Sequence, residues 1–179
     1  MSSVRHGFVV WLTGLSGAGK STIGQSVYED LTVDMPNTVL LDGDSFREIL
    51  GQDLGHDPRD RLTNAYRIAR MCRYLSSQGI NVVCCTMSLY PEIWEWNREN
   101  IPGYIEVYIK VSRETLFSRD PKGLYARAKK GEESNVIGMD IPFHEPVEPD
   151  LLLNNDESRP GSVEVQKSRV LEYLRVHSP

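Results

Sequence analysis

Three glycines and a lysine followed by a serine fall close together near the N-terminus, in the order Gly14, Leu15, Ser16, Gly17, Ala18, Gly19, Lys20, Ser21 and Thr22. The spacing fits G-x-x-x-x-G-K-[ST], in which the glycines let backbone N–H groups surround a phosphate. Lys20 then reaches the β- and γ-phosphates of a nucleotide, and Ser21 offers its hydroxyl to Mg²⁺. We therefore predict a binding site for ATP with Mg²⁺ here; the alternative is a glycine-rich turn with an exposed lysine.

Two carboxylates, Asp42 and Asp44, follow the next apolar run with Gly43 between them. Open α/β sheets bind ligands at the carboxyl ends of their strands, where these residues would lie. Asp42 is predicted to hold Mg²⁺ through water, and Asp44 to orient an acceptor hydroxyl, because phosphoryl transfer demands little of its base. A solvated Asp-Gly-Asp turn is the alternative, and the phosphate-binding loop upstream is what argues against it.

Basic residues gather in two places although the chain is acidic, with 20 Lys and Arg against 25 Asp and Glu. The net charge of −5 excludes the basic surface expected of a nucleic-acid binder. The first group lies within residues 59–73 and the second within residues 113–130. A solvated helix face is the usual reason for such runs. Here one group follows the Asp-Gly-Asp segment and the other lies in residues 120–149 or just before them, so at least Arg61 and Lys122 are expected to meet phosphates.

The elements that position these residues follow from apolar runs that alternate with stretches of helical period, typical of βαβ units around a parallel sheet. The expected strands cover residues 8–13, 38–42, 80–86, 104–111 and 151–154. The expected helices cover residues 20–31, 45–50, 58–77, 91–100, 112–119 and 162–176, with Ser112 and Ser162 as N-caps. Right-handed crossovers then predict an α/β fold: a five-stranded parallel sheet flanked by helices, in one domain over residues 1–179.

Residues 120–149, which we call the lid segment, break this pattern. They show little apolar periodicity and contain prolines at 121, 142, 146 and 149. A loop this long in a compact domain is usually a functional lid or is disordered. We expect a lid over the phosphate-binding edge of the sheet.

Other residue types indicate no further chemistry. Cys72, Cys84 and Cys85 lack metal-ligand spacing and are expected to be buried, reduced thiols. Trp94 and Trp96 are expected to pack a helix rather than stack on a base. The longest apolar run covers only residues 8–12, which is too short for a membrane span or a secretory signal, so we expect a cytoplasmic protein.

Taken together, the motifs resemble those of the adenylylsulfate kinase (APS kinase) family over nearly the whole chain. The matching stretches are 14–22, 41–44 with Arg47, 54–55, 60–61 with Asn64, 119–125, and 138–140 leading to the prolines at 142, 146 and 149. The sequence Asp-Pro-Lys-Gly-Leu-Tyr at 120–125 is the most discriminating of these. The resemblance implies a P-loop NTPase fold and transfer of the γ-phosphate of Mg·ATP to the ribose 3′-hydroxyl of adenylyl sulfate, and members of the family are often homodimers.

The resemblance also implies roles for single residues. It implies that the acceptor nucleotide is contacted by Arg47, Arg61, Asn64 and Ser88. Lys122, Gly123 and Leu124 belong to the lid over the acceptor, and Arg119 lies near the ATP adenine.

Departures from the family pattern lie on the acceptor side. His56 and Val136 stand where the family has phenylalanines, of which the second stacks on the acceptor adenine, and the segment 87–91 lacks the family's arginine. These changes favour an altered acceptor over lost catalysis, and the specific alternative is a cytidine diphosphoramidate kinase with the same 3′-hydroxyl chemistry. A nucleotide-binding regulatory protein and a general small-molecule kinase are further alternatives, against which the lid motif argues.

Overall fold

The structure, a computed structural model, describes residues 6–51, 53–120, 122–157 and 161–178. Its strands are β1 (Val9–Thr13), β2 (Thr38–Asp42), β3 (Asn81–Cys85), β4 (Tyr104–Lys110) and β5 (Leu151–Asn154). They form one sheet in the order β2-β3-β1-β4-β5, and every pairing is parallel. The predicted five-stranded parallel sheet is confirmed, with strand ends that shift by one residue where they differ.

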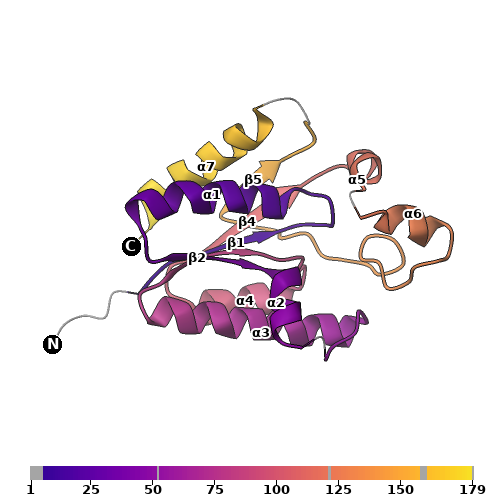
Figure 1. The fold of residues 1–179 in the computed structure, drawn as a ribbon, viewed down its shortest axis with the longest axis horizontal. Coiled ribbons are helices and arrows are strands. Elements are labelled where there is room, and N and C mark those ends of the chain that lie inside the picture. The colour runs from indigo at the N-terminus through magenta and orange to yellow at the C-terminus, as the bar shows by residue number, and fades with distance from the viewer. Residues whose placement is uncertain (1–5, 52, 121, 158–160, 179) are drawn as a thin grey trace.

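Helices cover both faces of the sheet (Figure 1). They are α1 (Lys20–Asp34), α2 (Gly43–Ile49), α3 (Pro58–Ser77), α4 (Pro91–Asn100), α5 (Arg113–Arg119), α6 (Leu124–Lys129) and α7 (Ser162–His177). Helices α1 and α7 contact each other on one face, whereas α3 and α4 contact each other on the other face. Helices α5 and α6 lie beyond one end of the sheet, where the phosphate-binding loop also lies.

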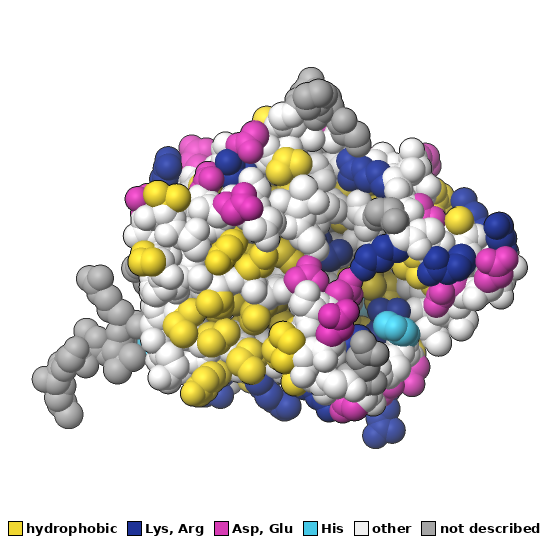
Figure 2. Space-filling view, in the orientation of Figure 1, with side chains coloured by type: hydrophobic (Ala, Val, Ile, Leu, Met, Phe, Trp, Pro, Cys, Tyr) yellow, Lys and Arg dark blue, Asp and Glu magenta, His cyan; other side chains and the backbone are white. Residues whose placement is uncertain are grey.

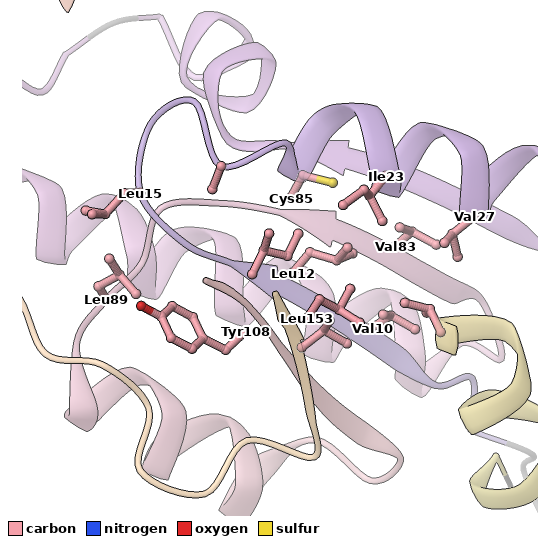
Figure 3. Packing of buried hydrophobic residues seen from close by; sticks show 14 of the residues in the cluster. Val10, Leu12, Leu15, Ile23, Val27, Val83, Cys85, Leu89, Tyr108 and Leu153 are labelled. Atoms are coloured by element: carbon pink, nitrogen blue, oxygen red, sulfur yellow. The ribbon is translucent and has the colours of Figure 1, made fainter. Parts of the chain in front are cut away.

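The hydrophobic core has two parts because the sheet is buried on both faces. Leu12 of β1 packs with Ile23 and Val27 of α1, as Figure 3 shows, whereas Trp11 packs with Ile68 of α3 on the opposite face. Full burial of such a side chain contributes roughly 1.5–3 kcal/mol to the free energy of unfolding. The three cysteines are free and buried, as predicted, so they serve the core.

Local hydrogen bonds explain where several helices begin. Ser112 caps α5 as predicted, since its Oγ accepts from the backbone N–H of Thr115 at 3.3 Å. The prediction for Ser162 is wrong: Gly161 is the N-cap of α7, and its φ of 86° is a left-handed conformation that glycine adopts without strain. Helix α2 begins two residues earlier than expected because the Asp42 carboxylate caps it, accepting from Asp44 N at 3.0 Å.

The lid segment contains the short helix α6 and a β-bridge between Ile137 and Ile141. Pro121, part of the most discriminating motif, lies outside the described residues. Sequence periodicity did not indicate α6 because a helix of six residues is too short to show a 3.6-residue period. The Asp120 carboxylate holds its first turn by accepting from the N–H groups of Tyr125 at 3.1 Å and Ala126 at 2.9 Å.

Candidate active site

A cavity of about 860 Å³ lies at the carboxyl ends of the strands, between the phosphate-binding loop and the lid segment. Figure 2 shows the molecule hollowed there, with basic and acidic side chains around the hollow. Most of the predicted site residues line it together, namely Ser16, Gly17, Gly19, Lys20, Ser21, Thr22, Asp42, Asp44, Arg47, His56, Arg61, Asn64, Ser88, Arg119, Lys122 and Leu124. Gly14, Ala18, Gly123 and Val136 belong to the same elements but do not line the cavity.

The phosphate-binding loop is held in a tight turn. Gly17 and Gly19 have φ values of 80° and 99°, which other residues adopt only with strain. The side chain of Asn155, just after β5, donates to the carbonyl of Ala18 at 2.8 Å and steadies the loop from outside. A side chain at Gly14 would meet the Ile109 carbonyl at 2.5 Å, so this glycine permits close packing of the loop on β4.

Lys20 is tucked into this loop, where its Nζ donates to the carbonyl of Leu15 at 2.8 Å. Burial lowers the pKa of Lys20 to about 8, and the nearby carboxylates of Asp44 and Asp42 offset only part of that effect. The ammonium therefore lies in a setting that favours a negative partner. A bound phosphate would supply one and favour the charged form further.

A hydroxyl and a carboxylate meet beside the lysine, as expected of a magnesium site. Ser21 Oγ donates to Asp42 Oδ2 at 2.6 Å, and both residues line the cavity. Mg²⁺ is usually held by one or two carboxylates together with substrate phosphates and water, rather than by a full protein cage. One hydroxyl and one carboxylate, side by side at the cavity, fit that mode.

The second carboxylate, Asp44, forms an ion pair with Lys122 of the lid segment. Burial alone would raise the pKa of Asp44, but the hydrogen bond and the charge of Lys122 outweigh it and hold that pKa below its ordinary value. Asp44 is thus an ionised hydrogen-bond acceptor at neutral pH. The contact joins residues 78 positions apart in the chain.

Two arginines, one from α2 and one from α3, line the cavity at positions where the sequence predicted acceptor binding. Arg47 donates to the carbonyls of Leu54 and Gly55, both at 2.8 Å. Arg61 donates to the carbonyl of His56 at 2.7 Å and to that of Asn135 at 3.0 Å, so it ties α3 to the lid segment. Their positive charges face a cavity in a protein that is acidic as a whole.

His56, Val136 and Tyr90 lie at the positions, or within the segment, where the sequence departs from the family pattern, and each has different surroundings. Burial, and then the charge of Arg61, lower the pKa of His56, so its imidazole is neutral at neutral pH. Val136, within the lid segment, is only 2% exposed and packs in the hydrophobic core. Tyr90 lines the cavity, and its buried hydroxyl has no hydrogen-bond partner within the described part of the chain.

Arg119 also lines the cavity and contacts the phosphate-binding loop, since its Nη1 donates to the carbonyl of Gly17 at 3.5 Å. Its Nη2 donates to the carbonyl of Asn155 at 2.7 Å, beside the phosphate-binding loop. The sequence did not single out Asn155, Glu157, Val163 or Glu133, which also line the cavity, and it indicated Arg127 only as part of the basic run within residues 113–130. Only Asn155 carried a usable signal, because it directly follows a predicted strand at the edge where open sheets bind ligands.

A parallel sheet with a glycine-rich phosphate loop after β1 and paired carboxylates after β2 defines a P-loop kinase. Residues 6–154 match the family Adenylylsulphate kinase, and the chain belongs to that family. The resemblance seen in the sequence is therefore confirmed. As a member, the chain is a phosphotransferase with an alcohol group as acceptor.

Individual relatives span nearly the same length. A cytidine diphosphoramidate kinase of Campylobacter jejuni is 43% identical over 83% of this chain and 86% of its own. An adenylyl-sulfate kinase of Deinococcus deserti is 39% identical over 98% of this chain and 96% of its own. The structure of the Mycobacterium tuberculosis APS kinase in complex with AMPPNP and APS superimposes with a TM-score of 0.87 at 34% identity, covering 96% of this chain and 99% of that one.

Within the described residues, no helix is both long enough and apolar enough to cross a membrane.

Proposed function

We propose that the chain transfers the γ-phosphate of Mg·ATP to the ribose 3′-hydroxyl of a nucleotide acceptor such as adenylyl sulfate. The observation that carries this proposal is the meeting of Lys20, the Ser21–Asp42 pair and the Asp44–Lys122 pair in one cavity. Its volume of about 860 Å³ suits two nucleotides placed end to end. The structure of the M. tuberculosis enzyme in complex with AMPPNP and APS supports the same arrangement.

The residues divide the chemistry between them. Backbone N–H groups of the loop and Lys20 hold the β- and γ-phosphates, while Ser21 and Asp42 hold Mg²⁺, which when bound neutralises charge on the phosphate oxygens. Asp44 orients the acceptor hydroxyl and takes its proton as the new P–O bond forms and the bond to ADP breaks. Lys122 stabilises the negative charge of the transferred group.

The proposed binding roles are those that the family resemblance implies, and they are supported by the lining of one cavity by most of these residues. Arg47, Arg61 and Asn64 bind the acceptor, with Ser88 at the cavity floor. Arg119 lies at the end that receives the ATP adenine, and Gly123 and Leu124 shape the lid over the acceptor.

Cytidine diphosphoramidate is a second candidate acceptor, and the placement of Val136 favours it. Because Val136 is buried, it does not offer a surface on which an acceptor base stacks. Loss of an aromatic stack costs roughly 1–3 kcal/mol per base, a cost that a smaller base in a re-shaped pocket avoids. The 43% identical relative named cytidine diphosphoramidate kinase points the same way.

A coupled assay of ADP release tests the proposal. Purified protein with Mg·ATP is offered adenylyl sulfate and cytidine diphosphoramidate side by side, and the products are identified by mass. Preference for adenylyl sulfate means that His56 and Val136 are tolerated in an APS kinase, whereas preference for the cytidine compound means that they mark a re-specialised pocket. AMP and CMP, which lack the sulfate-like tail, serve as control acceptors, and equal turnover with them indicates a general kinase.

Release of ADP that does not depend on any acceptor, or no release at all, contradicts the proposal and favours a regulatory nucleotide-binding protein. We also propose that residues 1–179 work as one cytoplasmic domain and pair as a homodimer. Light scattering of the purified protein decides the oligomeric state.

A further inference from the structure

Lys122 lies at a turn of the lid segment that is fixed from behind by Arg127. The Nη1 of Arg127 donates to the backbone carbonyl of Lys122 at 2.8 Å. The next residue, Gly123, has a φ of 62°, and a methyl group on it would lie 3.3 Å from that same Arg127 nitrogen. The guanidinium therefore packs tightly against the turn from which the Lys122 side chain departs.

Glu133 holds the other side of the same guanidinium. Its Oε2 accepts from Arg127 Nε at 3.3 Å and from Arg127 Nη2 at 3.2 Å. Glu133 lies beyond the end of α6, whereas Lys122 lies before its start. Arg127 therefore links the two segments of the chain that flank this helix. A planar guanidinium can serve a carboxylate and a carbonyl at once, which an ammonium does not do with the same geometry.

These contacts form a continuous series from Glu133 through Arg127 and Lys122 to Asp44. We infer that Arg127 and Glu133 are positioning residues, which hold the lid turn so that the Lys122 ammonium stays within reach of Asp44 and of the transferred phosphoryl group. The inference rests on the proposed function for the roles of Lys122 and Asp44. Arg127 acts through Lys122, and Glu133 acts through Arg127.

Kinetics of matched variants test the series. Arg127→Met is expected to lower kcat by about tenfold to a hundredfold, because a small displacement of a charge-stabilising group is costly. The KM for ATP, which binds mainly to the phosphate loop, is expected to change less than about twofold. Arg127→Lys recovers little activity, since it does not serve both partners. Lys130→Met, at the exposed end of α6, keeps the parent kcat and controls for charge loss on this helix.

A double-variant comparison separates positioning from simple stabilisation. Glu133→Gln alone is expected to lower kcat by about threefold, and to lower it no further in the Arg127→Met background, because the two residues act in series. The exchanged pair Arg127→Glu with Glu133→Arg restores an ion pair but not the bond to the Lys122 carbonyl. It is expected to regain thermal stability without regaining kcat, whereas recovery of both overturns the inference.

Zero-length carbodiimide cross-linking gives a readout that does not depend on activity. It joins an amine to a carboxylate in contact, so the Lys122–Asp44 cross-link reports their pairing, and the Lys167–Asp30 pair at 3.1 Å serves as the internal reference. The ratio of the two cross-links is expected to fall several-fold in Arg127→Met, and an unchanged ratio overturns the inference. A parent protein that cross-links as expected but phosphorylates no acceptor contradicts the proposed function instead.

Discussion

At the scale of single residues, Lys20 is the side chain on which the proposed phosphate binding depends most. Its ammonium is buried, and burial lowers its pKa to about 8, so the folded protein gains little stability from this charge. Lys20→Ala is therefore expected to leave the melting temperature nearly unchanged while lowering kcat by about a hundredfold or more, because the developing phosphate charge loses its cation. Circular dichroism measures the melting temperature and the ADP-release assay measures kcat, and retained turnover refutes the assigned mechanism.

Which single residues the sequence could predict depended on their separation along the chain. Lys20, Ser21 and the Asp42–Asp44 pair belong to short motifs, and all four line the same cavity. The pairing of Asp44 was less accessible, because Lys122 lies 78 positions away. The basic run indicated a phosphate contact for Lys122 and the resemblance assigned it to the lid, but neither indicated its contact with Asp44. The burial of the Val136 side chain was not predictable, because the lid segment lacks a period that would assign its residues to a buried or an exposed face.

At the scale of elements, the packing of α1 on the sheet depends on the absence of a side chain at Gly24. A methyl group there would lie 2.1 Å from Cys85 Sγ of β3. Gly24→Ala is expected to destabilise the protein by about 1–3 kcal/mol through overpacking. In a Cys85→Ala background the same change is expected to stabilise it by up to about 1 kcal/mol, because alanine favours a helix interior over glycine.

Urea unfolding of the four proteins in this cycle measures the free energy of unfolding of each. If Gly24→Ala has the same sign in both backgrounds, the contact with Cys85 is not what keeps this position a glycine. The thiol itself is unreactive in this role, since burial raises the pKa of Cys85 to about 12.

Helices and strands were predictable where they were long enough for their apolar residues to show a clear pattern. The strands show continuous apolar runs because both faces of the sheet are covered, and α3 was predicted with its observed ends, Pro58–Ser77. Helix α6 and the start of α2 depend instead on side-chain capping by Asp120 and Asp42. The N-cap position of α6 is Gly123, but the capping carboxylate belongs to Asp120, three residues earlier. The usual capping patterns place the side chain at the N-cap itself, so they do not indicate this start.

At the scale of the whole molecule, the strand order explains where the site lies. From β1 the chain crosses to β2 and β3 on one side and later returns to β4 and β5 on the other, so β1 lies at the switch point of the sheet. Ligand crevices form at such points, outside the carboxyl ends of the strands. The phosphate loop directly follows β1, and the basic side chains lining the cavity concentrate positive potential there despite the net charge of −5.

The stability of the whole molecule is expected to depend on pH through Glu106 of β4, which is far less exposed than the chain's other acidic residues. Its side chain is 3% exposed, and Oε2 accepts from Arg98 Nη2 at 2.7 Å, while Oε1 has no partner within the described ranges. Burial raises the pKa of Glu106 from 4.5 to about 7, and Arg98 offsets only part of this effect. Between these two values the folded state holds a proton that the unfolded state has released.

The free energy of unfolding therefore falls as pH rises from about 4.5 to about 7 and levels off above that, as far as Glu106 is concerned. His56 opposes this trend, because its lowered pKa makes stability rise as pH passes through the range where an unfolded histidine loses its proton. Glu106→Gln isolates the carboxyl group: His56 contributes equally to both proteins, so it cancels in the difference between their urea-unfolding curves. That difference is expected to change across the window and to be flat above about pH 7, whereas parallel curves throughout would mean that Glu106 is ionised in the folded protein and fully stabilised by Arg98.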